Sequence, residues 1–188
     1  MTRTAGKLTL QDFLALSQSS DRYELVDGEL KPKVSPKYQH STIQGRLFRY
    51  LDDWCDQQQV GRVRLEWGVI LQRRGVDWVP VPDLIYVSYE RLPQTWQEDQ
   101  PCPVAPELAI EIISPGQTFG ELTQKATDYL VAGINRVWIV DAKAQSLTIF
   151  RHDALPETLP VEAAIEDSLL PGFELPLVRL FAQPAQGS

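Results

Sequence analysis

The chain has 188 residues, 43% of them hydrophobic, and a formal net charge of −7, which is the composition of an ordinary globular domain. No apolar stretch approaches the roughly 20 residues that cross a bilayer, and residues 1–7 lack the apolar segment of a secretory signal. We therefore expect a cytoplasmic protein without a membrane segment. Cys55 and Cys102 are too few and too far apart for a disulfide framework or a zinc site, so we expect free thiols.

The acidic charge is distributed unevenly. Residues 1–75 contain 12 Lys and Arg against 9 Asp and Glu, whereas residues 76–188 contain 6 against 16. The total charge argues against a nucleic-acid partner, because Lys and Arg supply most of the affinity for phosphates. The basic residues of the first part could still form either a phosphate-binding face or a solvated surface. Nine of the 12 lie between residues 31 and 74: Lys31, Lys33, Lys37, Arg46, Arg49, Arg62, Arg64, Arg73 and Arg74.

Helix and hairpin signals occupy the first third of the chain. Apolar residues at helical spacing predict a short helix over 10–17 and a long one over 37–58. Between them, two short runs over 23–34 flank Asp27-Gly28, a dipeptide favoured in two-residue hairpin turns because both central residues adopt positive φ. We expect a helix, a β-hairpin and a second helix in that order.

The middle of the chain shows strand patterns. Alternation predicts one strand over 62–72 and another over 77–88. Residues 91–106 are polar and rich in proline, which predicts an exposed connection. A further apolar strand begins at Glu107, a helix is predicted over 118–132, and the apolar run 137–140 predicts a buried central strand.

Strand, helix and strand in this order form a crossover unit, whose two strands are usually parallel and whose hand is right. A further strand is predicted over 146–151, and the segment 169–180, rich in proline and glycine, predicts irregular structure. We expect a single domain over residues 1–182, α/β or α+β in class, on a mixed β-sheet. Residues 183–188 are expected to form a flexible tail.

One of the most apolar strands carries a carboxylate. Successive strand residues point to opposite faces, so Leu108, Ile110 and Ile112 point one way while Glu107 and Glu111 point the other. Burying the ionised Glu111 side chain without a partner would cost several kcal/mol, roughly, so it needs a cation.

Two other residues are suitable partners for Glu111. Asp83 follows Pro82 at the start of a predicted strand, and Lys125 lies beside the apolar stripe of the helix over 118–132. If the two strands are neighbours, Asp83 and Glu111 can share a hard cation, and oxygen ligands without a Cys or His cluster favour Mg²⁺ or Mn²⁺ over Zn²⁺. Lys125 could orient water or neutralise charge on a phosphate. The structural alternatives are a turn aspartate and a lysine that extends along the helix surface.

The order of these motifs resembles the Uma2 family of restriction-endonuclease-like proteins. The resemblance covers nearly the whole chain and implies a PD-(D/E)XK nuclease fold, a mixed sheet flanked by helices, with hydrolysis of DNA phosphodiester bonds as its chemistry. The residues that carry it are 23–29 (YELVDGE), 82–84 (PDL), 108–115 (LAIEIISP), Lys125, Tyr129, Ala132, Gly133, 137–141 (VWIVD) and 170–173 (LPGF).

By position, the resemblance assigns roles to four residues. Asp83 and Glu111 match the two metal-binding acids, with Mg²⁺ as the expected cofactor and Mn²⁺ as its substitute. Lys125 matches a lysine that the family places on the helix, and Glu24 matches the acid of the hairpin. We expect the four side chains to converge in one concave site.

Three further positions bear on this assignment. The simplest nuclease pattern has a lysine two residues after the second acid, where this chain has Ile113. Glu107 lies roughly 13 Å from Glu111 along an extended strand, too far to hold the same ion, so we expect a supporting or structural role. His40 matches a recurrent position of the family, and we expect it to make a structural polar contact.

Three functions remain compatible with the sequence. The first is a metal-dependent endonuclease that acts on DNA, which retention of the three chemical residues favours. The second is a catalytically inactive DNA-binding or self-associating module of nuclease ancestry, and the third is a hydrolase of a small phosphorylated substrate; the acidic charge suits both. We also expect a homodimer, because Trp67, Trp78 and Trp96 have the pattern of exposed aromatics and because nucleases of this class pair to reach two strands.

Overall fold

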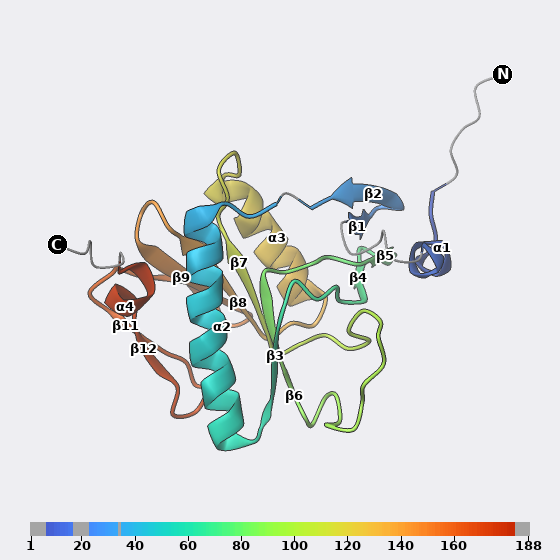
Figure 1. Cartoon of the computed structure of the whole chain (residues 1–188). Helices are drawn as coiled ribbons and strands as arrows, with labels where there is room; N and C mark the ends of the chain where they lie inside the picture. The colour runs from blue at the N-terminus through green and yellow to red at the C-terminus, as the bar shows by residue number, and fades with distance from the viewer. Residues whose placement is uncertain (1–6, 17–22, 34, 183–188) are drawn as a thin grey trace.

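A six-stranded mixed sheet forms the centre of the molecule. The computed structural model describes residues 7–16, 23–33 and 35–182 (Figure 1). The strand order is β10-β9-β8-β7-β6-β3; β7 and β8 are parallel, and the other neighbouring pairs are antiparallel. The strands are β3 (Gly61–Leu65), β6 (Leu84–Ser88), β7 (Leu108–Ile112), β8 (Arg136–Asp141), β9 (Ser146–Arg151) and β10 (Ala154–Leu159).

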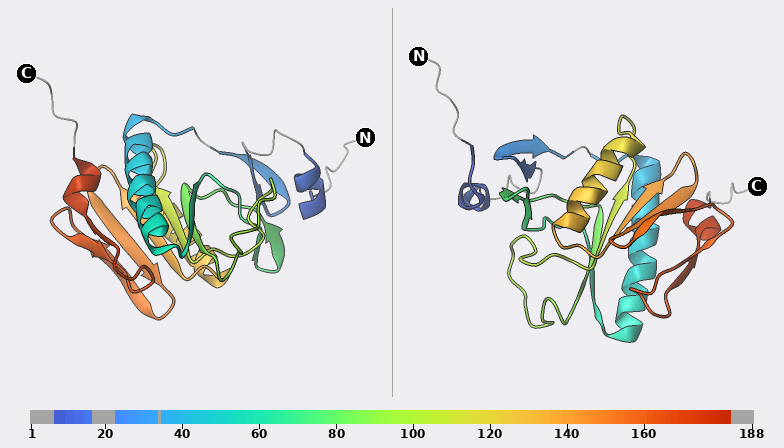
Figure 2. Two further views of the ribbon diagram at one scale, coloured as in Figure 1. Left: turned by 60° about the horizontal axis from the view of Figure 1, so that its bottom comes forward. Right: turned by 180° about the vertical axis from the view of Figure 1, so that it is seen from behind.

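Helices cover both faces of this sheet (Figure 2). α2 (Tyr38–Gln58) lies on one face and α3 (Phe119–Val131) on the other. In β7, Leu108 and Ile110 belong to the apolar core on the α2 side, whereas Ala109 belongs to the core on the α3 side. The alternation predicted for this strand is therefore confirmed, and the expected mixed sheet flanked by helices is the observed architecture.

The predicted crossover unit is present. β7 leads into α3 and α3 into β8, which lies parallel to β7 with Ile110 opposite Trp138. Thr118 caps α3: its hydroxyl accepts a hydrogen bond from the Glu121 N–H, and the Glu121 carboxylate accepts one from the Thr118 N–H. This capping box fixes where α3 begins and therefore which of its side chains face the sheet.

The N-terminal hairpin is docked onto the rest of the fold. β1 (Tyr23–Val26) and β2 (Glu29–Pro32) join through the predicted Asp27-Gly28 turn, where both residues have positive φ. Leu25 and Val79 exchange two main-chain hydrogen bonds of 3.1 and 3.0 Å. α1 (Leu10–Ala15), capped by Thr9 within its own capping box, ends before the predicted boundary at residue 17, which lies outside the described residues.

Two predicted strands are each divided in two. The segment 62–72 contains β3 and β4 (Leu71–Arg73), because the chain turns at Glu66, which has a positive φ of 46°. The segment 77–88 contains the end of β5 (Val76–Trp78) and β6, separated by Pro80 and Pro82, which have no N–H to continue a ladder. β4 and β5 pair as a separate hairpin.

The remaining segments differ from expectation in two places. The segment 169–180 is not irregular throughout: β12 (Glu174–Pro176) pairs with β11 (Ala164–Glu166), and α4 (Leu177–Phe181) follows. Pro171 and Gly172 mark a single turn, and Pro176 ends β12 immediately before α4. The connection 91–106 forms no helix or extended strand within the described chain, but Leu92 and Cys102 are buried, so it packs against the core. The expected tail, 183–188, lies outside the described residues.

Three compositional expectations can also be compared with the structure. Cys55 and Cys102 are free and buried. Trp78 is buried and stacked on Tyr129, and Trp67 packs against Trp96, so the expectation of exposed aromatics is wrong for Trp78. None of the helices in the described ranges has the length and apolar character that a membrane crossing requires.

Candidate active site

The two predicted metal-binding acids lie side by side because β6 and β7 are neighbours. Leu84 is opposite Ile110 in the antiparallel ladder, which places Asp83, one residue earlier, beside Glu111. The N–H of Ile112 donates a hydrogen bond of 2.7 Å to Asp83 Oδ2. Both acids are buried, with 4% and 6% of their surfaces exposed.

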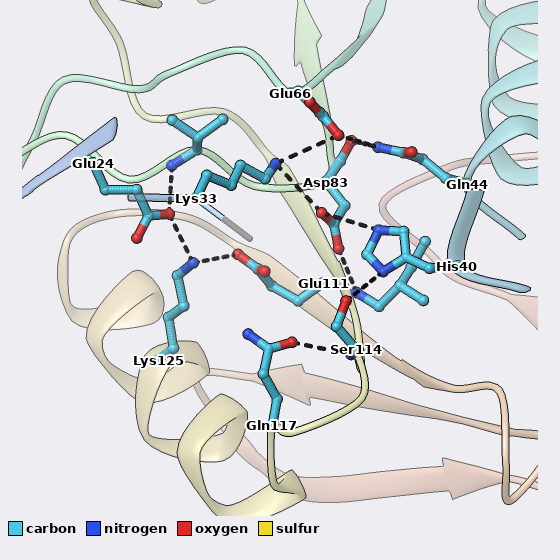
Figure 3. A network of polar contacts seen from close by, with 12 residues as sticks. Glu24, Lys33, His40, Gln44, Glu66, Asp83, Glu111, Ser114, Gln117 and Lys125 are labelled. Atoms are coloured by element: carbon cyan, nitrogen blue, oxygen red, sulfur yellow. Dashed lines mark hydrogen bonds and ion pairs between the residues drawn. The ribbon is translucent and has the colours of Figure 1, made fainter. Parts of the chain in front are cut away.

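Lys125 connects Glu111 to the N-terminal hairpin (Figure 3). Its Nζ lies 3.0 Å from Glu111 Oε1 and 3.1 Å from Glu24 Oε1. The docking of β1 against Val79 positions Glu24, whose Oε1 also accepts a hydrogen bond from the Val81 N–H at 2.9 Å. The four predicted residues therefore come together, although Glu24 and Lys125 are 101 positions apart.

The charge state of Glu111 is set by opposing effects. Burial raises the pKa of Glu111, and the nearby charges of Asp83 and Glu24 act in the same direction. The Lys125 ammonium and the Tyr129 hydroxyl, which donates a hydrogen bond of 2.7 Å to Glu111 Oε1, act in the opposite direction without cancelling the shift. A further cation near Glu111 would favour the ionised carboxylate and so lower this pKa.

Lys125 remains charged. Burial acts to lower the pKa of Lys125, but the carboxylates of Glu111 and Glu24 outweigh it and raise this pKa above its ordinary value. A lysine in this state is a fixed positive charge and cannot serve as a proton acceptor near neutral pH.

A second group of residues surrounds Asp83. His40 Nε2 lies 3.3 Å from Asp83 Oδ1, and His40 Nδ1 is within hydrogen-bond distance, 2.9 Å, of Ser114 Oγ. Burial acts to raise the pKa of Asp83, but the neighbouring His40 ring and the charge of Lys33 lower it below its ordinary value. The predicted polar contact of His40 is thus a contact with the acidic site itself.

Sequence reasoning missed the parts that Lys33, Glu66 and Gln44 play here. Lys33 Nζ lies 3.4 Å from Asp83 Oδ1 and 3.8 Å from Glu66 Oε1, and among the described residues no atom accepts a hydrogen bond from it. Gln44 Nε2 donates to the main-chain oxygen of Asp83 at 3.1 Å and to Glu66 Oε1 at 3.3 Å. In the sequence Lys33 is only one of nine basic residues between residues 31 and 74, and no local signal separates it from the others.

Glu107 lies outside this group. Its carboxylate accepts hydrogen bonds from the N–H and hydroxyl of Ser88, at 2.9 and 2.5 Å, and forms an ion pair of 3.1 Å with Arg91 Nε. Its carboxylate is therefore paired at the beginning of β7, away from Glu111. This agrees with the structural role expected for it.

The cluster has an excess of negative charge. Glu24, Glu66, Asp83 and Glu111 contribute four carboxylates, and Lys33 and Lys125 two ammonium groups, which leaves two negative charges when all four acids are ionised and His40 is neutral. One divalent cation would balance them.

The donor atoms fit a magnesium-like ion. Throughout the part of the chain that the structure describes, no group of three or more His, Cys, Asp or Glu side chains is close enough to hold a metal by itself. Mg²⁺ does not need such a cage, since it commonly binds one or two carboxylates and keeps waters or substrate phosphates as its other ligands. Asp83 and Glu111 supply that minimal set.

Comparisons with known proteins identify the family and a similar solved structure. The family model Uma2, described as a putative restriction endonuclease, matches residues 10–178. The crystal structure of a putative nuclease belonging to DUF820 from Anabaena variabilis is similar, with a TM-score of 0.79 and 25% sequence identity, and the alignment covers 93% of this chain and 97% of that one. The search of curated proteins gives no match. The match over residues 10–178 shows that the chain belongs to the Uma2 family.

Proposed function

We propose that this protein is a metal-dependent endonuclease that hydrolyses DNA phosphodiester bonds in the cytoplasm. The observation that carries the proposal is the excess of two negative charges among Glu24, Glu66, Asp83 and Glu111 beside two lysines; Asp83 and Glu111 are buried, whereas the Glu66 side chain is 41% exposed. A purely structural ion-pair network has no need of that excess, because uncompensated negative charge beside the buried Asp83 and Glu111 carboxylates is destabilising. The family description and the similar crystal structure point to the same class of enzyme.

Each residue of the cluster has a proposed part in this reaction. Asp83 and Glu111 would hold Mg²⁺, which when bound would polarise the phosphate and favour ionisation of a water molecule. Lys125 would stabilise the negative charge that develops on the phosphate and position the attacking water. Glu24 fixes the Lys125 ammonium, since its Oε1 lies 3.1 Å from Nζ.

Lys33 is the more loosely held of the two cations. Its Nζ is 3.4 Å from the nearest carboxylate oxygen, whereas Lys125 Nζ is 3.0 Å from its partner. Lys33 Nζ is buried, so it would have to move outward to reach an incoming phosphate, but in the described part of the chain this movement breaks no hydrogen bond. We assign Lys33 to binding the substrate phosphate.

The test is a cleavage assay. The parent protein is incubated with supercoiled, linear duplex and single-stranded DNA in the presence of Mg²⁺, Mn²⁺ or EDTA. We expect cleavage with either cation and none with EDTA, and loss of cleavage in Asp83→Asn and Glu111→Gln. Glu162→Gln, at an exposed residue in a turn, is the matched control and should cleave like the parent.

One outcome would favour the alternative function. If the parent cleaves none of these substrates with either cation but still binds DNA, the protein is a binding module of nuclease ancestry, which its net charge of −7 also suits.

We further infer a single domain over residues 1–182 that acts as a homodimer. Cutting both strands of a duplex in one binding event calls for two active sites, and a two-fold pair is the commonest arrangement that supplies them. Sedimentation should give a dimer at working concentration. A monomer at every concentration would remove this part of the proposal and leave single-strand cleavage.

A further inference from the structure

A groove of about 660 Å³ opens beside the acidic cluster. Three segments line it: the beginning of α2, the loop between β7 and α3, and the turn between β8 and β9, which lie at the same end of the molecule in Figure 1. His40 and Ser114 belong to its lining, and they connect it to Asp83 through the 2.9 and 3.3 Å contacts of the His40 ring. The groove is therefore next to the proposed active site, with the buried His40 side chain between the groove and Asp83.

The charged groups of the groove favour an anion, in contrast to the chain as a whole. Lys37 and Lys143 line it and are exposed. One acid, Asp141, also lines it, but its Oδ1 already accepts hydrogen bonds of 2.9 Å from the N–H groups of Lys143 and Ala144.

The beginning of α2 adds to this positive character. Within the described ranges this 21-residue helix has neither a side-chain cap nor an acidic residue in its first turn. The first turn lines the groove, so the positive end of the helix dipole is directed toward whatever the groove contains.

Two exposed aromatic rings belong to the same lining. Tyr38, at the start of α2, is 73% exposed, and Phe119, at the start of α3, is 44% exposed. Neither belongs to one of the apolar cores. Aromatic rings beside lysines are the usual features of a surface that binds unpaired nucleic acid, because bases stack on the rings while cations contact the phosphates. A continuous duplex keeps its base faces covered and offers nothing to such rings.

From these features we propose that the groove binds an unpaired stretch of the substrate strand. Its phosphates contact Lys37, Lys143 and the start of α2, and its bases stack on Tyr38 and Phe119. The volume lies within the roughly 300–1,000 Å³ range of small-ligand pockets, which suits a segment of nucleotide size. The inference rests on the proposed nuclease function and narrows its substrate to strands that are unpaired beside the scissile phosphate, such as single strands, flaps or frayed ends.

Fluorescence anisotropy of a labelled oligonucleotide tests the stacking contacts. Binding of the single strand and of its duplex is compared in EDTA, where no hydrolysis occurs, and again with Ca²⁺, which neutralises the acidic cluster. We expect the parent to prefer the single strand. Tyr38→Ala and Phe119→Ala should each weaken its binding roughly 10-fold, the loss typical of one base–aromatic stack, whereas Tyr38→Phe should bind like the parent. Leu155→Ala, at a residue 87% exposed on β10, is the control and should have no effect.

The salt dependence of the same binding tests the lysines. Lys37→Ala and Lys143→Ala should each reduce the slope of log affinity against log salt concentration by about 0.7, the contribution of one phosphate contact to a single strand. Lys31→Ala, at an exposed residue of the hairpin, should leave the slope unchanged.

Three results would overturn the inference. The first is that the parent binds the duplex as tightly as the single strand, or more tightly. The second is that both Tyr38→Ala and Phe119→Ala bind the single strand like the parent. The third is that a free nucleoside monophosphate competes as strongly as the oligonucleotide, which would make the occupant a small molecule. Failure of the proposed function looks different. If the parent binds single strands through these residues but never cleaves them, the proposed binding groove stands and the proposed nuclease function is wrong. If the parent cleaves DNA while the groove variants bind single strands normally, the nuclease function stands and the proposed binding groove is wrong.

Discussion

Replacing Lys125 by methionine removes the ammonium but retains the length of the side chain, and it leaves Glu24 and Glu111 without their shared cation. These two carboxylates are 17% and 8% exposed, so water can solvate neither of them well. Breaking a buried ion pair by removing one partner costs roughly 3–5 kcal/mol. Because the Lys125 side chain itself is 22% exposed, we expect the lower end, about 3 kcal/mol, which for a chain of this size lowers Tm by roughly 6–12 °C.

Two companion measurements show whether the loss of stability in Lys125→Met comes from the removed charge. The double variant Lys125→Met/Glu111→Gln returns the cluster to two excess negative charges and retains an acceptor for the Tyr129 hydroxyl, so it should recover about 1 kcal/mol or more of the loss. Mn²⁺ should raise the Tm of Lys125→Met by more than that of the parent, because the single variant has three excess charges.

The stability of the parent should also fall at alkaline pH as Lys125 loses its proton. Its raised pKa means that its contribution to stability is complete below the ordinary lysine value near 10.5 and is lost as the pH rises through the higher folded value. Thermal denaturation across pH measures these effects on stability. In single-turnover cleavage, the rate of Lys125→Met should be roughly 10²–10³ times lower than that of the parent. A Tm of Lys125→Met within 2 °C or so of the parent, or strictly additive effects in the double variant, would refute the electrostatic reasoning.

Three further changes probe other parts of the site and core. Asp83→Asn keeps the side-chain shape but removes one ligand charge, so calorimetric Mn²⁺ affinity and cleavage should fall together; loss of cleavage with unchanged affinity would contradict this. Tyr129→Phe removes the hydroxyl that donates to Glu111 and should lower the unfolding free energy by about 2 kcal/mol in denaturant titrations, whereas an unchanged midpoint would show that the bond is not needed. Burial raises the pKa of Cys55 to about 12 and that of Cys102 to about 11, so neither thiol should react with a disulfide reagent at pH 8 until the protein unfolds, and rapid labelling of the native protein would be inconsistent with their burial.

The parts of the fold that the sequence predicts are those determined locally. The Asp27-Gly28 turn, the cap at Thr118 and the alternating faces of β7 depend on residues a few positions apart. The division of the strand predicted over 62–72 depends on Glu66 adopting positive φ, which no simple pattern of side chains signals, whereas Pro80 and Pro82 mark the division of 77–88 in the sequence itself.

The site could be predicted only in part, for a related reason. Glu111 is conspicuous because it is a carboxylate within an apolar strand. Lys33, by contrast, reaches Asp83 only because the hairpin docks through Leu25 and Val79, and that contact between distant segments leaves no periodicity in the sequence. His40 reaches Asp83 in the same way, through the packing of α2 against the sheet.

The most direct test of the account is a crystal structure with Mn²⁺, using the anomalous signal of the metal. We predict one strong peak at about 2.1 Å from carboxylate oxygens of both Asp83 and Glu111, with waters as the remaining ligands. If saturating Mn²⁺ gives no peak there, and Lys33 and Lys125 still contact the two carboxylates, the cluster is a structural ion-pair network and the proposed metal-dependent nuclease mechanism is wrong.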